Sequence, residues 1–145
     1  MERLGLCIKT LEYPKDIDMC HEIRRRVFIV EQDVRVAEEI DGLDGECVHF
    51  LAERDGIALG TARLRSEGDV AKVERVAVLA EHRGRGIGRA LMVEIEGAAL
   101  ARGYRELLLG AQLRAIPFYE SLGYVVEGDE YLDARIRHRW MRKTL

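Results

Sequence analysis

Two patterns of hydrophobic and polar positions alternate along the chain, one typical of β-strands and the other of α-helices. The strand-like pattern predicts strands over residues 4–11, 47–54, 57–65, 70–78, 106–111, 124–127 and 136–143. Asp55-Gly56, between the second and third of these, is a two-residue signal for a tight antiparallel hairpin. Because no segment repeats at a fixed period and no linker interrupts the pattern, residues 1–145 are expected to form one domain.

Helical periodicity is expected in three places. Asp16 can cap a first helix, whose apolar side chains recur every three or four positions, at Met19, Ile23, Val27 and Val30. A second helix begins near Gly86 and ends at Arg102-Gly103, a cation followed by a glycine suited to a helix C-terminus. A short third helix over residues 114–122 ends at Gly123. Residues 38–46 are acidic, contain glycines and lack periodicity, which predicts a loop.

The order of these elements predicts a mixed α/β fold. The run over residues 106–111 is almost wholly apolar, as expected for a strand buried on both faces beside a parallel neighbour. The helix before it would be the crossover from the strand at residues 70–78. In the last strand, Ile136, His138 and Trp140 share the apolar face, so His138 is expected to be a buried histidine with satisfied hydrogen bonds.

Composition and charge narrow the class of protein. The chain has 145 residues, of which 48% are hydrophobic and 34% charged, as in a globular protein. Its apolar runs are far shorter than the ~18 residues of a membrane span, and Met1-Glu2-Arg3 precedes no signal-type apolar core, so a cytoplasmic protein without a membrane partner is expected. A net charge of −3 argues against binding nucleic acid over the whole surface, and the arginines within residues 24–26 and 135–139 are expected to be solvated.

The cysteines give no sign of a disulfide framework or a metal site. Cys7, Cys20 and Cys47 are odd in number and form no C-x-x-C pair. Cys47 and His49 could in principle join Cys20 and His21 around a metal ion, but these spacings match no structural zinc pattern. No metal is therefore expected.

The stretch from Val76 to Arg89 carries the most chemical information, because a strand leads through a short turn into the start of a helix rich in glycine and arginine. Glycine lets backbone N–H groups approach an anion, and the helix start supplies positive charge. A P-loop would need Gly-Lys-Ser/Thr, and a dinucleotide fingerprint would need G-x-G-x-x-G, whereas these glycines run G-x-G-x-G. A turn built only for its shape would leave the arginines unexplained. The turn therefore predicts a site for a di- or polyphosphate.

This stretch resembles a known family. Arg83-Gly-Arg-Gly86-Ile-Gly88 is similar to the R/Q-x-x-G-x-G/A motif of the GNAT superfamily of N-acetyltransferases, and it follows a Val-Ala-Val strand as it does there. The segment from Ala115 to Tyr124 resembles that family's A-x-x-F-Y-x-x-x-G-F/Y segment. Gln112 stands where the superfamily commonly has Asn. Further residues resemble a subgroup of small bacterial GNAT proteins, namely Arg25-Arg-Val-Phe28-Ile-Val-Glu31-Gln32, His49, Gln112 and Ile136-Arg-His138.

The resemblance implies both a fold and a ligand. The fold would have a central, mostly antiparallel sheet, a parallel pair of strands that splay apart, and helices on both faces. The co-substrate would be acetyl-CoA, with its pyrophosphate on the amides of residues 85–89 and its pantetheine arm along Val76 and Val78. The Ala77 amide would polarise the thioester carbonyl. The residues expected to bind acetyl-CoA are Val76, Ala77, Val78, Arg83, Gly84, Arg85, Gly86, Ile87, Gly88, Arg89 and Gln112.

Direct acetyl transfer also needs an acid for the departing thiolate and a base for the amine. Tyr119 matches the family's acid. Glu74 is the first candidate for the base, since regular alternation would put it on the same strand face as Val76 and Val78. His49, His138 and Glu31 remain alternatives, because imidazoles titrate near neutral pH and Glu31 is a further carboxylate.

The expected function is acetyl-CoA-dependent transfer of an acetyl group to a primary amine of a small molecule or peptide, by an enzyme that could be a homodimer. The alternative is a non-catalytic acyl-CoA-binding sensor, which would keep the phosphate turn but need no acid. If the carboxylates of Glu38, Glu39, Asp41, Asp44 and Glu46 border the acceptor site, they would favour a cationic acceptor; otherwise they form a solvated acidic loop.

Overall fold

The computed structural model describes residues 5–145, and its strands form one seven-stranded sheet in the order β1-β2-β3-β4-β5-β7-β6. Every pair of neighbouring strands is antiparallel except β4 and β5, which are parallel. This confirms the predicted mixed architecture. The strands are β1 (Leu6–Leu11), β2 (Cys47–Arg54), β3 (Ile57–Glu67), β4 (Val70–Val78), β5 (Glu106–Gln112), β6 (Val125–Asp133) and β7 (Ile136–Thr144).

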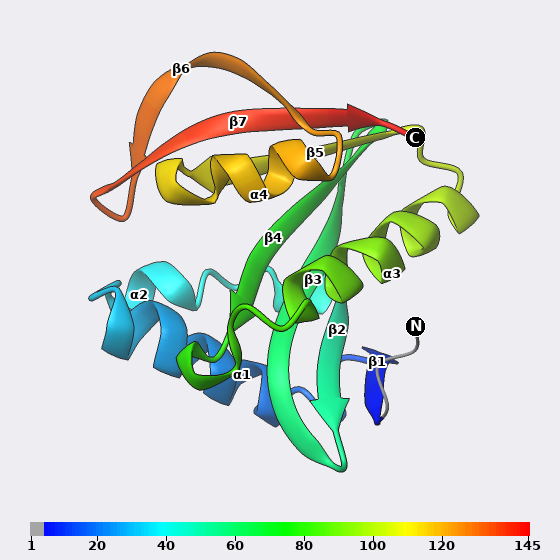
Figure 1. Cartoon of the computed structure of the whole chain (residues 1–145), viewed down its shortest axis with the longest axis vertical. Helices are drawn as coiled ribbons and strands as arrows, with labels where there is room; N and C mark the ends of the chain where they lie inside the picture. The colour runs from blue at the N-terminus through cyan, green and yellow to red at the C-terminus, as the bar shows by residue number, and fades with distance from the viewer. Residues whose placement is uncertain (1–4) are drawn as a thin grey trace.

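Helices cover both faces of the sheet. The α-helices are α1 (Asp18–Arg24), α2 (Val36–Glu39), α3 (Ile87–Ala101) and α4 (Ile116–Ser121). A π-helical segment, η1 (Arg25–Glu31), continues α1, and three short 3-10 turns are η2 (Asp44–Glu46), η3 (Ala80–His82) and η4 (Leu113–Ala115). In Figure 1, β6, β7 and α4 lie together at the top, α1 and α2 at the lower left, and β4 runs between them.

Two apolar clusters hold these layers together. The larger one joins α3 to the sheet, with Leu91, Met92 and Ile95 packed among side chains such as Phe50 and Leu109. The smaller one lies on the other face and packs α1 against the sheet; its members are Ile17, Cys20, Ile23, Val27, Leu51, Ala77 and Leu79. No helix among residues 5–145 is both long and apolar enough to cross a membrane.

The turns anticipated from glycine are confirmed. Asp55 and Gly56 have φ angles of 52° and 78°, and positive φ at both central residues is what a two-residue hairpin turn of this type requires. Gly103 follows α3 with a φ of 88°, and Gly123 follows α4 with a φ of 95°. These residues end helices where a side chain would make the left-handed conformation costly.

The first helix differs from its prediction. Asp16 does not cap it, since the N-cap is Ile17 and no side-chain cap hydrogen bond forms. Met19 and Val30 are exposed, whereas Cys20 is buried. The π-helical turn of η1 shifts the angular position of every later residue, so a regular 3.6-residue period fails there. β6 runs on to Asp133 instead of ending near residue 127, and Leu4, predicted to begin β1, lies outside the described residues.

A bulge in β4 is the feature that matters most for the site. Glu74 pairs with Arg63 and Ala77 pairs with Thr61, so two residues of β4, Arg75 and Val76, lie opposite a single residue of β3. Arg75 has a φ of 58°. The extra residue reverses the alternation, and Glu74 therefore lies on the α1 face with Ala77. The expectation that Glu74 shares a face with Val76 and Val78 is wrong.

Candidate active site

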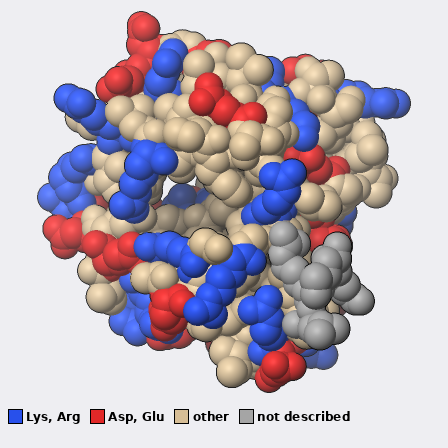
Figure 2. Space-filling model, viewed as in Figure 1, with Lys and Arg blue, Asp and Glu red and all other residues tan. Residues whose placement is uncertain are grey.

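A cleft of about 860 Å³ opens where β4 and β5 part. The two strands pair only from Ala71↔Leu107 to Val73↔Leu109, and then they separate. Figure 2 shows this face of the molecule hollowed near its middle, with Lys and Arg side chains around the hollow. Of the residues expected to bind acetyl-CoA, all but Arg85 line the cleft. Of the catalytic candidates, Tyr119, Glu74 and His138 line it, whereas Glu31 and His49 do not.

The edge of β4 that faces the cleft carries backbone groups with no neighbouring strand. Leu79 donates its N–H to the carbonyl of Leu59 in β3, at 3.0 Å. Because backbone groups alternate along a strand, the amides of Val78 and Val76 point toward the cleft and that of Ala77 points toward β3. This geometry argues against the Ala77 amide as the donor to the thioester carbonyl. It favours the amide of Val76 instead.

The glycine-rich turn leads directly into α3. Gly84 and Gly86 have φ angles of 77° and 80°, and Gly86 is the N-cap of the 15-residue helix. At these angles a side chain would be strained, and without one the first amides of α3 stay open to a ligand. Such exposed N–H groups, at the positive end of the helix dipole, suit an anion. Arg89 and Arg114 also line the cleft.

Arg83 is already occupied by protein groups. Its guanidinium makes two hydrogen bonds to the carboxylate of Glu31, at 2.6 and 2.7 Å, and Nε donates to the carbonyl of Val78 at 2.9 Å. The hydrogen bond from Arg83 lowers the pKa of Glu31. Glu31 is therefore a poor candidate for a base, and Arg83 serves first to fix the turn against η1.

Tyr119 reaches the cleft from α4, on the face covered by α3. Its ring packs edge-on against Phe118 and Tyr124, with ring centroids 5.0 and 5.8 Å away. Its hydroxyl has no hydrogen-bond partner among residues 5–145, and burial raises its pKa. The phenol thus stays neutral and keeps a proton to donate into the cleft.

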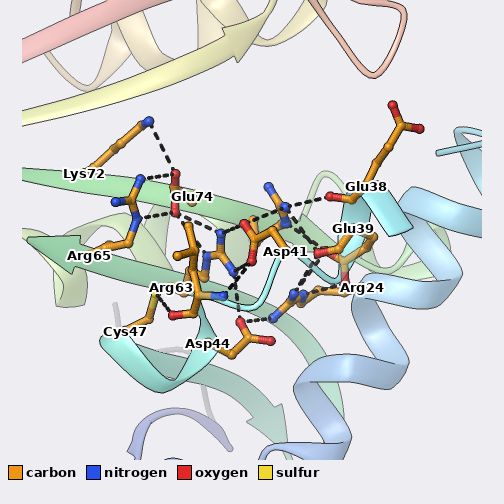
Figure 3. Close-up of polar contacts among 12 residues, drawn as sticks. Arg24, Glu38, Glu39, Asp41, Asp44, Cys47, Arg63, Arg65, Lys72 and Glu74 are labelled. Carbon is orange, nitrogen blue, oxygen red and sulfur yellow. Dashed lines mark hydrogen bonds and ion pairs between the residues drawn. The ribbon is translucent and has the colours of Figure 1, made fainter. Parts of the chain in front are cut away.

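Glu74 sits in a network of buried ion pairs rather than free in the cleft (Figure 3). Its Oε1 accepts hydrogen bonds from Arg63 at 3.0 Å and from Arg65 at 3.2 Å. Burial raises its pKa, but the hydrogen bond from Arg65 and the charges of Arg63 and Arg65 outweigh burial, so the net effect is a lower pKa. A carboxylate held in this way is a weak base.

The same network takes in the loop predicted to be solvated or to border the acceptor. Glu39 and Asp44 are buried and bind Arg24, with Nε to Glu39 Oε1 at 2.9 Å and Nη1 to Asp44 Oδ1 at 2.8 Å. Asp41 pairs with both Arg63 and Arg75. Glu39 and Asp44 are thus neutralised inside the protein, and Asp41 is paired at its surface, so the reading of the loop as a solvated acidic segment is wrong. Arg24, expected to be solvated, is 1% exposed.

The two histidine candidates have opposite environments. His49 is 1% exposed, lies outside the cleft and bonds through Nε2 to the carbonyl of Asp44 at 2.9 Å, and burial lowers its pKa. His138 lines the cleft, and its Nδ1 lies 2.7 Å from the carbonyl of Ile136. Only His138 is placed to meet a ligand.

An aromatic wall that the sequence did not single out completes the cleft. Tyr131 stacks on His138 and on Trp140, with ring centroids 5.6 and 5.0 Å apart. The ammonium of Lys72 lies 4.8 Å from the centroid of Trp140. The alternation of β7 placed Trp140 with His138, but nothing local showed that Tyr131 would reach them, because β6 is irregular between Glu127 and Tyr131. Among the described residues no group of three or more His, Cys, Asp or Glu could hold a metal ion.

Comparisons with known proteins agree with this geometry. The uncharacterized N-acetyltransferase YjcF of Bacillus subtilis is 39% identical over 122 residues, covering 83% of this chain and 87% of the relative. An acyl-CoA N-acyltransferase of Pseudomonas aeruginosa is 28% identical, with a TM-score of 0.84, over 96% of this chain and 99% of that one. The PaiA N-acetyltransferase of Thermoplasma acidophilum, solved in complex with coenzyme A, shares the fold at 18% identity and a TM-score of 0.75, over 98% and 100% of the chains.

A family model described as an acetyltransferase (GNAT) domain matches residues 17–145, which include the cleft, the glycine-rich turn and Tyr119. The two sharpest motifs of the resemblance lie within residues 83–124, whereas this match extends over most of the chain. The protein therefore belongs to the GNAT family of acetyltransferases.

Proposed function

We propose that this acetyltransferase moves the acetyl group of acetyl-CoA directly to a primary amine of a small molecule or peptide. The observation that carries the proposal is the free edge of β4, which leads into the start of α3 and faces, across one cleft, a Tyr119 hydroxyl with no hydrogen-bond partner among residues 5–145. Acetyl-CoA supplies a thioester and a pyrophosphate, and these residues offer amides, cations and a proton donor at matching points.

The backbone of β4 would hold and polarise the acyl donor. The amides of Val76 and Val78 face the cleft without a strand partner, so the amide and carbonyl groups of a pantetheine arm can satisfy them. The Val76 amide would then stabilise the oxygen charge that develops as the amine attacks. At the other end, the amides that follow Gly86, with Arg89 and Arg114, would bind the pyrophosphate.

Tyr119 would act as the acid. As the new C–N bond forms and the C–S bond breaks, its hydroxyl gives a proton to the sulfur and regains one from the nitrogen that has attacked. A phenol kept neutral by burial suits this role, because its proton moves only when strong negative charge develops beside it. A sensor that only bound the cofactor would have no use for a partner-free hydroxyl there, and this favours the enzyme over the sensor.

The test combines ligand binding with transfer. Acetyl-CoA and CoA should both raise the melting temperature. At a ligand concentration ~100 times the dissociation constant, binding should add about 2.7 kcal/mol to the free energy of unfolding. Gly86→Val should abolish this shift, because the φ of 80° strains any side chain at the turn that leads into α3. Gly97→Val, on α3 with open space around it, is the matched control.

Transfer is followed as free thiol released from acetyl-CoA with glucosamine, spermidine, benzylamine and triglycine as acceptors. Amine-dependent release supports the enzyme. Stabilisation by CoA with no release for any amine supports the sensor. Stabilisation by ATP or NAD but not by CoA would overturn the proposal altogether.

A further inference from the structure

His138 is the one candidate base whose free nitrogen opens into the cleft. Glu31 is held by Arg83, Glu74 by Arg63 and Arg65, and His49 lies outside the cleft. The buried side-chain nitrogens and oxygens without a partner in residues 5–145 are His82 Nδ1 and Arg139 Nε. Nε2 of His138 has no hydrogen-bond partner within the described part of the chain and is not among these buried atoms, so this nitrogen is accessible from the cleft.

The tautomer of His138 follows from its single hydrogen bond. The carbonyl of Ile136 can only accept, so the nitrogen 2.7 Å away, Nδ1, must carry the proton and donate it. In the neutral ring, Nε2 then holds the lone pair. The backbone of β7 thus presents the cleft with a proton acceptor in a fixed orientation.

The strand registers put His138 level with the polarising amide. His138 pairs with Gln112 at the end of β5. If the parallel register of Val73↔Leu109 is continued past the bulge, Ala77 comes level with Gln112. His138 therefore lies across the gap from residues 76–77 of β4, at the height where the thioester carbonyl would be held.

His138 and Tyr119 approach this point from opposite faces of the sheet. Directly paired residues share a face, so His138 and Gln112 project to one side. Leu109 and Ala111 project to the other side, into the core cluster that contains Tyr119. An acid on the α3 face and a base on the α1 face match a transfer in which the acyl donor and the acceptor enter from opposite sides.

We propose that His138 is the general base of this reaction, an inference that rests on the proposed acetyl transfer. The acceptor arrives as an ammonium ion, and Nε2 takes one of its protons and passes it to solvent. The nitrogen lone pair freed in this way attacks the acetyl carbon. Tyr119 then protonates the departing sulfur and regains a proton from the nitrogen that has attacked. The products are the acetylated amine, the free thiol and the proton released to solvent.

Tyr131 positions the ring of His138 by stacking on it, 24° from parallel. Gly110 makes room for the Tyr131 hydroxyl, since a Cβ at that position would lie far inside contact distance of it. The ring of His138 is therefore fixed by Ile136 on one edge and by Tyr131 on one face. Tyr131 is therefore a positioning residue.

The ionisation that limits the rate must be assigned to His138 against the other titratable groups that line the cleft. Burial raises the pKa of Tyr131 to about 12. Hydrogen bonds from the backbone of Arg35 and the side chain of Arg135 lower the pKa of Glu38. For Glu74, the effects of Arg65 and Arg63 outweigh burial and lower the pKa. The remaining charged side chains that face this part of the cleft are Glu39 on α2, Lys72 and Arg75 on β4, Asp133 on β6 and Arg114 on η4. His82, at the phosphate end, is the only other imidazole in the cleft lining.

The experiment compares His138→Asn with the native enzyme over a pH range, using the amine of the four-member panel that reacts fastest. Asn can still donate to the Ile136 carbonyl, but it has no counterpart of the Nε2 lone pair. We expect kcat/KM at pH 7 to fall by about 10²–10⁴-fold. The variant should approach the native rate at high pH, where the amine loses its proton unaided, and its CoA dissociation constant should stay within about twofold.

His82→Gln and Glu74→Gln are the controls, and both should keep the ionisation that limits the rate at low pH. The proposal is overturned if His138→Asn keeps that ionisation, if Glu74→Gln loses it, or if raising the pH does not rescue the asparagine variant. Ring-nitrogen NMR of His138 gives a test that needs no acceptor: the neutral ring must carry its proton on Nδ1, and a proton on Nε2 would refute the assignment. A native enzyme that binds CoA but acetylates none of the amines would instead count against the proposed function.

Discussion

Nε of Arg75 donates a 2.7 Å hydrogen bond to Oε2 of Glu39, and this contact ties the bulge of β4 to α2. Arg75 has a φ of 58°, a conformation that costs a non-glycine residue energy and persists only where its surroundings enforce it. Its Nη2 also donates to the carbonyls of Glu38 and Glu39, at 3.2 Å each. The network of buried ion pairs therefore holds the bulge that aims the Val76 amide at the cleft.

The first prediction concerns the stability of this network. Arg24→Met should lower the free energy of unfolding by up to about 3–5 kcal/mol, because Glu39 and Asp44 stay buried while each loses one of its two arginine partners. Urea unfolding measures the loss. Arg25→Met is the matched control, since the next arginine pairs with Glu22 on the exposed surface and its loss should barely move the unfolding midpoint. Equal effects of the two substitutions would refute a structural role for the buried pairs.

The second prediction concerns acid. Burial alone would raise the pKa of Asp41, but hydrogen bonds from Arg63 and the backbone of Leu43 lower it to about 2. A group whose pKa is lower in the folded state stabilises the protein above its unfolded pKa of about 4, and this stabilisation is lost as pH falls toward 2. Asp41→Asn should therefore flatten the dependence of unfolding free energy on pH between about 4 and 2. Asp129→Asn, on the exposed part of β6, should leave that dependence as it is in the native protein.

The sequence predicts the fold well wherever local chemistry decides the structure. Asp55-Gly56 and Gly103 fix their turns through backbone conformation alone. The apolar run over residues 106–111 correctly predicts a strand, but only one of its faces is buried: Leu107, Leu109 and Ala111 are buried, whereas Gly110 on the other face is exposed. The bulge at Arg75 depends on contacts with residues distant in the sequence, and the alternating pattern expected of a regular strand gives no sign of it. For the same reason the sequence puts Glu74 on the wrong face of β4.

The third prediction is that the carboxylates within residues 38–46 do not select a cationic acceptor. The sequence shows the carboxylates of this segment, but it does not show that Arg24, Arg63 and Arg75 form ion pairs with them. Because Glu39, Asp41 and Asp44 are paired with arginines, they add no surplus negative charge that would attract a cationic acceptor. Glu38→Gln, which removes the loop's exposed pair with Arg135, should change KM for spermidine and for benzylamine by the same factor at low salt. A rise confined to spermidine would restore the cationic-acceptor hypothesis.

The fourth prediction tests the acid. Tyr119→Phe keeps the edge-on packing against Phe118 and Tyr124 while it removes the hydroxyl. We expect kcat to fall by about 10²–10⁴-fold, with CoA binding nearly unchanged, because only the proton donor to the sulfur is lost. Thiol release and thermal stabilisation by CoA measure the two quantities. Unaltered turnover would remove Tyr119 from the mechanism, and loss of CoA binding would give it a binding role instead.

The fifth prediction tests how the ring of His138 is positioned. Gly110→Ala should destabilise the protein by about 1–3 kcal/mol, since the new methyl group collides with the Tyr131 hydroxyl, and kcat should fall as Tyr131 leaves the His138 ring. Tyr131→Phe alone should have little effect on stability, because that hydroxyl has no hydrogen-bond partner in residues 5–145.

The double variant Gly110→Ala with Tyr131→Phe is the control. Once the hydroxyl is gone, the nearest ring atom of residue 131, Cζ, lies 3.5 Å from the added Cβ, which is an ordinary contact. The double variant should therefore recover most of both losses, as a double-mutant cycle of unfolding free energies and of kcat/KM would show. Simple addition of the two single effects would mean that Tyr131 does not link Gly110 to His138.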